Sequence, residues 1–225
     1  DLIDKFGADA LRFTLAAMAA QGRDIRLSEN RVAGYRNFAT KLWNAARFVE
    51  MNGCRPHPGF DPATCRQMLN RWIVAEVARV AEAATLALDA YRFNDAANGL
   101  YQFVWGTFCD WYLELIKPVL SGEDGEAKAE TRHACAWVLE RIVHLLHPFA
   151  PFVTEELWRV LLADGRKGFL MDRAWPHTAS VPIDRDAVEE MEWVIRLIGE
   201  IRTARAEMNV PPSAKLGLAL NGASP

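Results

Sequence analysis

Apolar residues recur with the helical period through most of this sequence, over segments too long to be ordinary strands. In the segment 65–91, Ile73, Val77, Val80, Ala84 and Leu88 fall on one face when successive residues turn by about 100°. Pieces rich in proline and glycine, such as 53–62, separate these segments. The pattern predicts an all-α protein, an antiparallel helix bundle whose helices are joined by short links.

Helix ends are predicted from capping residues and prolines. We expect Asn94 and Thr154 to begin helices and Pro118 to end one. Trp111 and Trp137 are expected to be buried in the largest core, formed by the helices near 31–51, 65–91, 95–117 and 130–147. The complete set of expected helices is 4–20, 31–51, 65–91, 95–116, 130–146, 154–162 and 186–208.

Charge is unevenly spread along the chain. Its 225 residues carry a formal net charge of −3, which gives no global attraction to nucleic acid or to an acidic membrane. Between residues 21 and 49, however, six cations face two anions. A local positive face on a mildly acidic chain favours docking of one polyanion over indiscriminate binding. The six cations are Arg23, Arg26, Arg31, Arg36, Lys41 and Arg47.

Motifs of the common catalytic and metal sites are absent from the sequence. It has no glycine-rich phosphate loop, no GxSxG and no HExxH. His144 and His147 lie three apart, but no second ligand pair answers them, so a helix-end pair bonded to backbone is favoured over a metal site. No apolar run reaches the roughly 20 residues of a membrane span. We expect no catalytic residue and no metal site. The four cysteines form no CxxC pair: Cys54, Cys65, Cys109 and Cys135.

The stretch NFATKLWNAARF places an aromatic ring among polar side chains. At helical spacing Asn37, Lys41, Asn44 and Phe48 share a stripe, and Arg47 lies beside it. One interpretation is that Phe48 closes the rim of the bundle and its polar neighbours are solvated. The other is a ring that stacks on an unpaired RNA base, with amides and cations reading the base edges.

Five blocks of the sequence resemble the C-terminal part of the bacterial valyl-tRNA synthetases, a branch of the class I aminoacyl-tRNA synthetases. Two of them, GADALR within the first and HPFAPFVTEELW, are shared with the isoleucyl and leucyl branches. The pairing of NFATKLWNAARF with FCDWYLELIKP is more particular to the valyl branch. The blocks are DLIDKFGADALRFTLA, GRDIRLSENRVAGYRNFATKLWNAARF, YRFNDAANGLYQFVWGTFCDWYLELIKP, HPFAPFVTEELW and IRTARAEMNVPPSAKL.

The resemblance implies three regions: a stem-contact segment (1–30), a helical anticodon-binding domain (31–182) and the start of a small α/β module (183–225). The segment 215–220 resembles a strand whose partners lie outside the chain. The family's HIGH and KMSKS motifs and its editing domain are missing here. The chain is therefore expected to be an inactive fragment without a cofactor, from an ATP- and Mg²⁺-dependent valine–tRNA ligase.

The resemblance also implies partners and contact residues. The partners are the anticodon loop of valine tRNA and the catalytic and editing domains of the same chain. A cytoplasmic monomer that contacts no membrane is expected. Matching motif positions assign Lys41, Arg47 and Phe48 to the anticodon bases, with Asn37 and Asn44 as neighbours. Valine anticodons share only their middle adenine and last cytosine, so a surface that contacts these two adjacent bases is sufficient. The alternative function is a protein-interaction helix bundle that binds no RNA.

Overall fold

The computed structural model describes residues 1–225 except 21–23, 163–167, 179–180, 182, 212 and 220–225. Among the described residues there are helices and no strand, which confirms the predicted all-α class. The α-helices are α1 (Leu2–Phe6), α2 (Ala8–Met18), α3 (Glu29–Met51), α4 (Met68–Asp89), α5 (Phe93–Gln102), α6 (Leu113–Ser121), α7 (Glu126–Leu146), α8 (Pro151–Leu157) and α9 (Arg185–Glu207). The segments η1 (Pro62–Thr64) and η4 (Leu170–Asp172) are 3₁₀-helices, and η2 (Phe103–Tyr112) and η3 (Trp158–Leu162) are π-helices.

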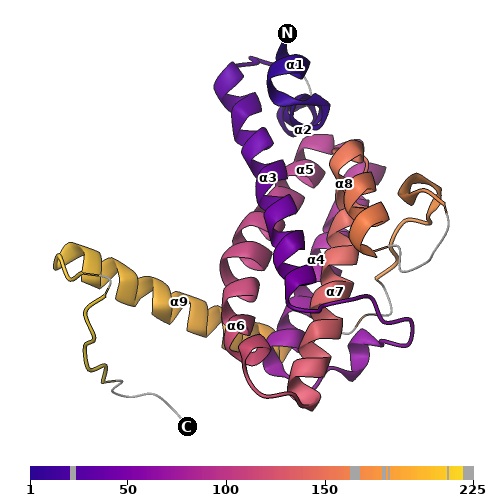
Figure 1. The fold of residues 1–225 in the computed structure, drawn as a ribbon. Helices are drawn as coiled ribbons and strands as arrows, with labels where there is room; N and C mark the ends of the chain where they lie inside the picture. Colours follow the sequence, from indigo (N-terminus) through magenta and orange to yellow (C-terminus); the bar gives the residue numbers. More distant parts are fainter. Residues whose placement is uncertain (21–23, 163–167, 179–180, 182, 212, 220–225) are drawn as a thin grey trace.

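The bundle is built from α3, α4, α7 and the continuous run α5–η2–α6, which lie side by side in Figure 1. This confirms the predicted core. The helices α1 and α2 lie at one end, and α9 extends away from the other end. One core cluster nevertheless includes Phe13 and Ala17 of α2 together with Val188 and Met191 of α9. The first turns of α9 are therefore packed on the bundle, although most of the helix projects from it.

Several predicted helix boundaries are wrong. The segment 4–20 is two helices, because Gly7 adopts a φ of 87° between α1 and α2, a conformation that favours glycine. Arg92 rather than Asn94 precedes α5, and Thr154 lies inside α8, which begins with Pro151. A proline needs no backbone donor in a first turn, so it opens that helix well.

Pro118 does not end a helix, contrary to the prediction, because α6 continues to Ser121 and ends at Gly122. An internal proline costs about 3 kcal/mol. Here Ile116 and Leu120 on the two sides of Pro118 are buried, and full burial of such a side chain contributes about 1.5–3 kcal/mol. Burial of the two side chains therefore offsets the lost backbone hydrogen bond.

The two tryptophans predicted to be buried are only partly buried. Guanidinium carbons of Arg202 and Arg141 lie 5.1 and 5.2 Å from the ring centroids of Trp111 and Trp137, respectively. The buried place next to Trp111 is taken by Tyr112, whose side chain is 0% exposed. For Trp111 the prediction assumed an α-helical register, whereas η2 is a π-helix, in which the face of each residue shifts. Trp137 lies in the α-helix α7, and the π-helical turn does not account for its partial exposure.

The C-terminal segment differs from the strand expected over 215–220. Residues 215–219 are exposed and form no strand, and residue 220 lies outside the described part of the chain. A strand needs neighbouring strands to satisfy its backbone groups, and the part of the chain that the structure describes offers none. Searched over the described residues, no helix combines the length and apolar character that crossing a bilayer requires.

Candidate nucleic-acid interface

The helix α3 divides its surface between core and solvent. Phe38, Leu42 and Val49 are at most 3% exposed and face the bundle. Asn37 and Asn44 are exposed on the other side, as is Arg47. The predicted stripe therefore lies along the solvent side of a helix whose apolar side is anchored in the core. Such an anchored helix holds polar side chains at fixed positions.

Lys41 joins α3 to the neighbouring segment η2. Its Nζ atom lies 2.6 Å from Oδ1 of Asp110 and 4.0 Å from the centroid of the Trp105 ring. The side chain of Lys41 is 26% exposed and that of Asp110 is 50% exposed. Lys41 is thus held by one carboxylate and one aromatic face while it still reaches solvent.

Phe48 occupies the border between the core and the predicted surface. The ring is partly buried and packs against the core cluster. Nζ of Lys117, on α6, lies 5.8 Å from the centroid of this ring and 2.6 Å from Oε1 of Glu114. The two interpretations of Phe48 are compatible in this position, because a ring at a rim has one part in the core and another part accessible.

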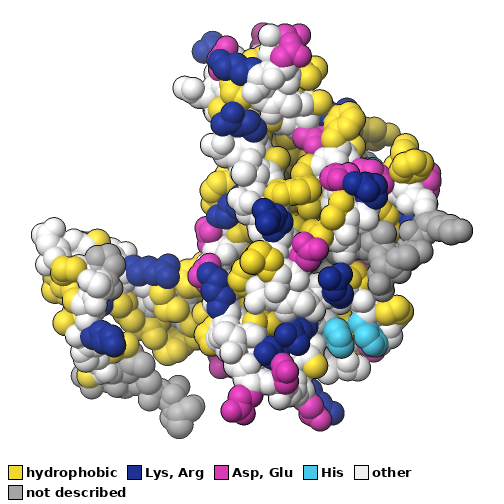
Figure 2. Space-filling view, in the orientation of Figure 1, with side chains coloured by type: hydrophobic (Ala, Val, Ile, Leu, Met, Phe, Trp, Pro, Cys, Tyr) yellow, Lys and Arg dark blue, Asp and Glu magenta, His cyan; other side chains and the backbone are white. Residues whose placement is uncertain are grey.

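The polar neighbours differ in how they are held. Asn37 accepts a long hydrogen bond of 3.4 Å from the Nη2 atom of Arg36. No hydrogen bond or ion pair is described for the side chains of Asn44 and Arg47 within the part of the chain that the structure covers. Figure 2 shows Lys and Arg side chains spaced along α3, with Asp and Glu side chains between them. The surface is therefore mixed in charge rather than uniformly basic.

Three residues of this surface were missed in the sequence: Trp105, Asp110 and Lys117. None of the three was assigned to the contact surface from the sequence. In an α-helix five positions exceed one turn of 3.6 residues, so Trp105 and Asp110 would not share a face. In the π-helix η2, hydrogen bonds join residues five apart, and both side chains contact Lys41. A lone aspartate in the run FVWGTFCDWY was the only signal.

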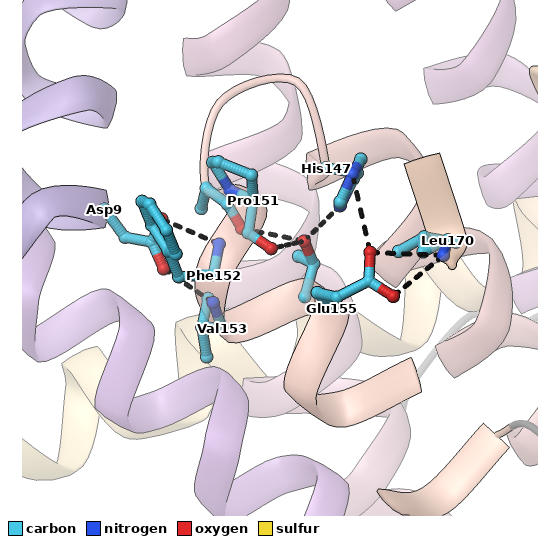
Figure 3. A network of polar contacts seen from close by, with 9 residues as sticks. Asp9, His147, Pro151, Phe152, Val153, Glu155 and Leu170 are labelled. Carbon is cyan, nitrogen blue, oxygen red and sulfur yellow. Dashed lines mark hydrogen bonds and ion pairs between the residues drawn. The ribbon is translucent and has the colours of Figure 1, made fainter. Parts of the chain in front are cut away.

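A second polar network lies at the end of the bundle near α2 (Figure 3). The carboxylate of Asp9 accepts hydrogen bonds from the backbone N–H groups of Phe152 (3.1 Å) and Val153 (2.6 Å). These N–H groups belong to the first turn of α8 and have no partner within their own helix. Asp9 therefore caps a helix from a position 143 residues away and fastens α2 to the bundle.

The same network continues through His147 and Glu155 (Figure 3). The hydroxyl of Thr154 donates to the carbonyl of Ala150 at 2.7 Å and accepts from Nδ1 of His147 at 2.8 Å. Nε2 of His147 lies 3.9 Å from Oε2 of Glu155, which also accepts from the backbone N–H of Leu170. Burial lowers the pKa of His147, and the charges of Glu155 and Asp9 partly oppose this shift.

The two histidines weighed as metal ligands are used in the fold. Nδ1 of His144 donates to the carbonyl of Glu140 at 3.0 Å, and the ring packs edge-on against Trp158. His147 belongs to the network of Asp9 and α8. Searched over the described residues, no group of three or more His, Cys, Asp or Glu side chains is arranged to hold a metal ion.

The arrangement on α3 and η2 suits binding to exposed bases. It offers a partly buried aromatic ring at Phe48, amide groups at Asn37 and Asn44, a cation at Arg47, and a paired donor and acceptor at Lys41 and Asp110. Unpaired bases are recognised by aromatic stacking and by hydrogen bonds to their edges.

Comparison with known proteins gives a consistent result. The family model of the anticodon-binding domain of tRNA ligase matches residues 70–220. Valine–tRNA ligase of Caulobacter vibrioides is 54% identical over 226 residues, which cover 100% of this chain and 25% of that protein. Valine–tRNA ligase of Agrobacterium fabrum is 56% identical over 228 residues, which cover 100% of the chain and 24% of that protein. The chain thus spans about a quarter of the length of these relatives.

A similar fold occurs in a solved structure. The LeuRS of Agrobacterium radiobacter, crystallised in a ternary complex with tRNA and LeuAMS, aligns with a TM-score of 0.63 and 18% identity. The alignment covers 81% of this chain and 21% of that one. At this identity the likeness concerns the fold alone, and it agrees with the helix bundle described above.

Proposed function

The chain belongs to the family of anticodon-binding domains of tRNA ligases, and from this premise we propose that it is the anticodon-binding part of a valine–tRNA ligase. The similarity to valine–tRNA ligases runs through the whole chain, which supports the valyl assignment. In this proposal the fragment holds the anticodon of valine tRNA while a catalytic domain outside the chain attaches valine with ATP and Mg²⁺. The fragment contributes binding and no chemistry of its own.

The proposed contact surface is the solvent edge of α3: Asn37, Lys41, Asn44, Arg47 and Phe48. The observation that carries it is the position of these side chains on one anchored helix, with three of them exposed. Phe48 stacks on a base, and the amides and cations contact base edges or phosphates. The alternative, in which this surface binds another protein, is disfavoured because the chain belongs to a family of anticodon-binding domains.

The remaining expectations form part of the same proposal. The chain divides into a stem-contact segment (1–30), the anticodon-binding domain (31–182) and the start of an α/β module (183–225). It works as one part of a monomeric cytoplasmic enzyme, beside the catalytic and editing domains of the same polypeptide. The long common core of α2, the bundle and the start of α9 supports a fixed arrangement of these regions.

Binding of valine tRNA to the 225-residue chain over a range of salt concentrations tests the proposal. Affinity is expected to fall as salt rises, because each neutralised phosphate releases counterions. Arg47→Ala should weaken binding, whereas Arg159→Ala, which removes an exposed arginine of η3, should leave it nearly unchanged.

A second RNA, with the middle anticodon adenine replaced, separates two roles of Arg47. A base contact predicts that Arg47→Ala lowers discrimination between the two RNAs, whereas a phosphate contact predicts equal weakening and a smaller salt slope. Failure of the unsubstituted chain to bind valine tRNA at low salt would contradict the proposal.

A further inference from the structure

The ion pair between Lys41 and Asp110 sets a hydrogen-bond donor directly beside an acceptor. The two groups come from residues 69 positions apart, on α3 and η2, and lie 2.6 Å from each other. The Trp105 ring lies against the ammonium group at 4.0 Å and limits its movement. Because an ammonium has three protons, the pair with Asp110 leaves donors free on Lys41. The half-exposed carboxylate of Asp110 likewise keeps acceptor sites open to solvent.

This pair has a fixed polarity that neutral side chains lack. A carboxylate only accepts hydrogen bonds, and an ammonium only donates them. An amide such as that of Asn44 presents both and rotates to suit either pattern. The pair therefore accepts only one order of groups on the edge of a base seated against it.

We propose that Asp110 is a specificity-determining residue that selects cytosine at the last anticodon position. This inference rests on the proposed function. Asp110 accepts a hydrogen bond from the exocyclic 4-amino group of the cytosine, a contact that carboxylates make with this base. Lys41 donates to the neighbouring ring nitrogen N3, which is an acceptor in cytosine.

Uracil inverts both contacts in the same seat. Its O4 carbonyl takes the place of the amino group and faces the carboxylate of Asp110, so two acceptors meet. Its N3–H takes the place of the ring acceptor and faces Lys41, so two donors meet. Valine codons begin with G, so the last base of every valine anticodon is cytosine, and rejection of uracil at this position is part of the required selection.

The nearby carboxylate of Glu114 provides a contrast. Glu114 pairs with Lys117 three residues along the same helix, at 2.6 Å, and both side chains are about half exposed. Pairs of this kind are ordinary on helix surfaces. Among the described residues, only the Lys41–Asp110 pair both joins two elements beside the predicted stripe and is backed by an aromatic ring. Glu114→Gln therefore serves as the matched control, since it removes one carboxylate charge from α6, the helix that directly follows η2.

The experiment measures binding of the 225-residue chain to valine tRNA and to the same RNA with the last anticodon base changed to uracil. The unsubstituted chain is expected to bind the uracil RNA on the order of 10-fold more weakly. Asp110→Asn should reduce this ratio to about two- or threefold, because an amide turns its donor towards O4. Glu114→Gln should keep the full ratio, and circular dichroism should show all three proteins equally helical.

The outcomes separate the inference from the proposed function. If the chain binds valine tRNA and Asp110→Asn keeps the full ratio, Asp110 does not read the base and the inference is wrong, while the proposed function stands. Equal loss of discrimination in Asp110→Asn and Glu114→Gln would also overturn it, because the effect would then be general charge. If the unsubstituted chain binds neither RNA, both the proposed function and the inference fail.

Discussion

At the residue scale, Phe48 combines two demands on one ring. Its inner part packs against the core cluster, while its position at the edge of α3 leaves it beside the proposed contact surface. Truncation to alanine would disturb both packing and stacking and could not separate them. A substitution that keeps apolar volume and removes the flat ring is therefore the informative one.

Phe48→Leu is expected to keep the fold and lose stacking. Exchange of one large apolar side chain for another should cost about 1 kcal/mol of stability. The loss of base stacking should cost roughly 1–3 kcal/mol of affinity for valine tRNA. Phe48→Tyr, which retains a flat ring, should preserve most of both. Urea unfolding and RNA titration measure the two effects, and normal binding by folded Phe48→Leu would show that Phe48 serves only the core.

The sequence predicted the residues of the surface that lie on α3 but not those that lie on η2. The helical period alone put Asn37, Asn44 and Arg47 on the side that the structure exposes. Trp105 and Asp110 were out of reach because the helical period assumes α-helical turns, whereas η2 is a π-helix, which is a rare conformation. The same turn moved Trp111 out of the core and Tyr112 into it.

At the scale of elements, α8 depends on a residue from another helix. It is seven residues long, and its first-turn N–H groups receive no side-chain cap from its own N-cap residue, Ala150. Asp9 of α2 supplies the acceptors instead, with one carboxylate oxygen for each of two N–H groups. Periodicity and capping rules look only at neighbours in sequence, so this contact could not be predicted from them.

Asp9→Ala is expected to lower the free energy of unfolding by about 1 kcal/mol, the usual cost of a lost helix cap. Asp9→Asn should lose less, since asparagine also accepts from N–H groups at helix starts. Asp4→Ala is the control, because the Asp4 side chain is 82% exposed and its described ion pair is with the chain's N-terminus, at 3.7 Å. Urea unfolding compares the three; equal stability of Asp9→Ala and the unsubstituted chain would contradict the role given to Asp9.

The segment that follows α9 is attached to the helix through Arg205. Arg205 donates to the carbonyls of Pro211 (2.6 Å) and Ala214 (3.0 Å), which turns the chain back after the helix. Residues 215–219 beyond this point are exposed, and no backbone hydrogen bond is described for them. Their amides should exchange with solvent within the shortest measurable time, whereas those of α4 should be protected. Strong protection at Lys215–Ala219 would contradict this prediction.

At the scale of the whole molecule, one core and one polar network hold the N-terminal helices, the bundle and α8 together. The core includes residues from α2 to α9. Its long helices could be predicted because their apolar residues recur with the helical period. The network of Asp9, His147 and Glu155 adds a titratable group where α2, α7, α8 and η4 meet (Figure 3). The stability of the whole fold should therefore depend on the protonation of His147.

Acid is expected to destabilise the protein from about neutral pH downward. Burial holds the pKa of His147 below its ordinary value of 6.5, and burial together with the nearby His57 does the same for His133. The unfolded chain therefore takes up these protons at higher pH than the folded chain. The resulting stability is complete above pH 6.5 and is lost as pH falls through that value, until the folded pKa is passed.

Urea unfolding between about pH 8 and about pH 5.5 measures this loss. His147→Asn should flatten the pH dependence, because the amide still donates to Thr154 but does not titrate in this range. His177→Asn, at an exposed histidine, should leave the dependence unchanged. Exposed carboxyls with lowered pKa values, Glu29, Asp124 and Glu156, titrate below their ordinary 3.8 to 4.5 and so lie outside this window. An unchanged slope in His147→Asn would place the acid sensitivity elsewhere, with His133→Asn as the next variant.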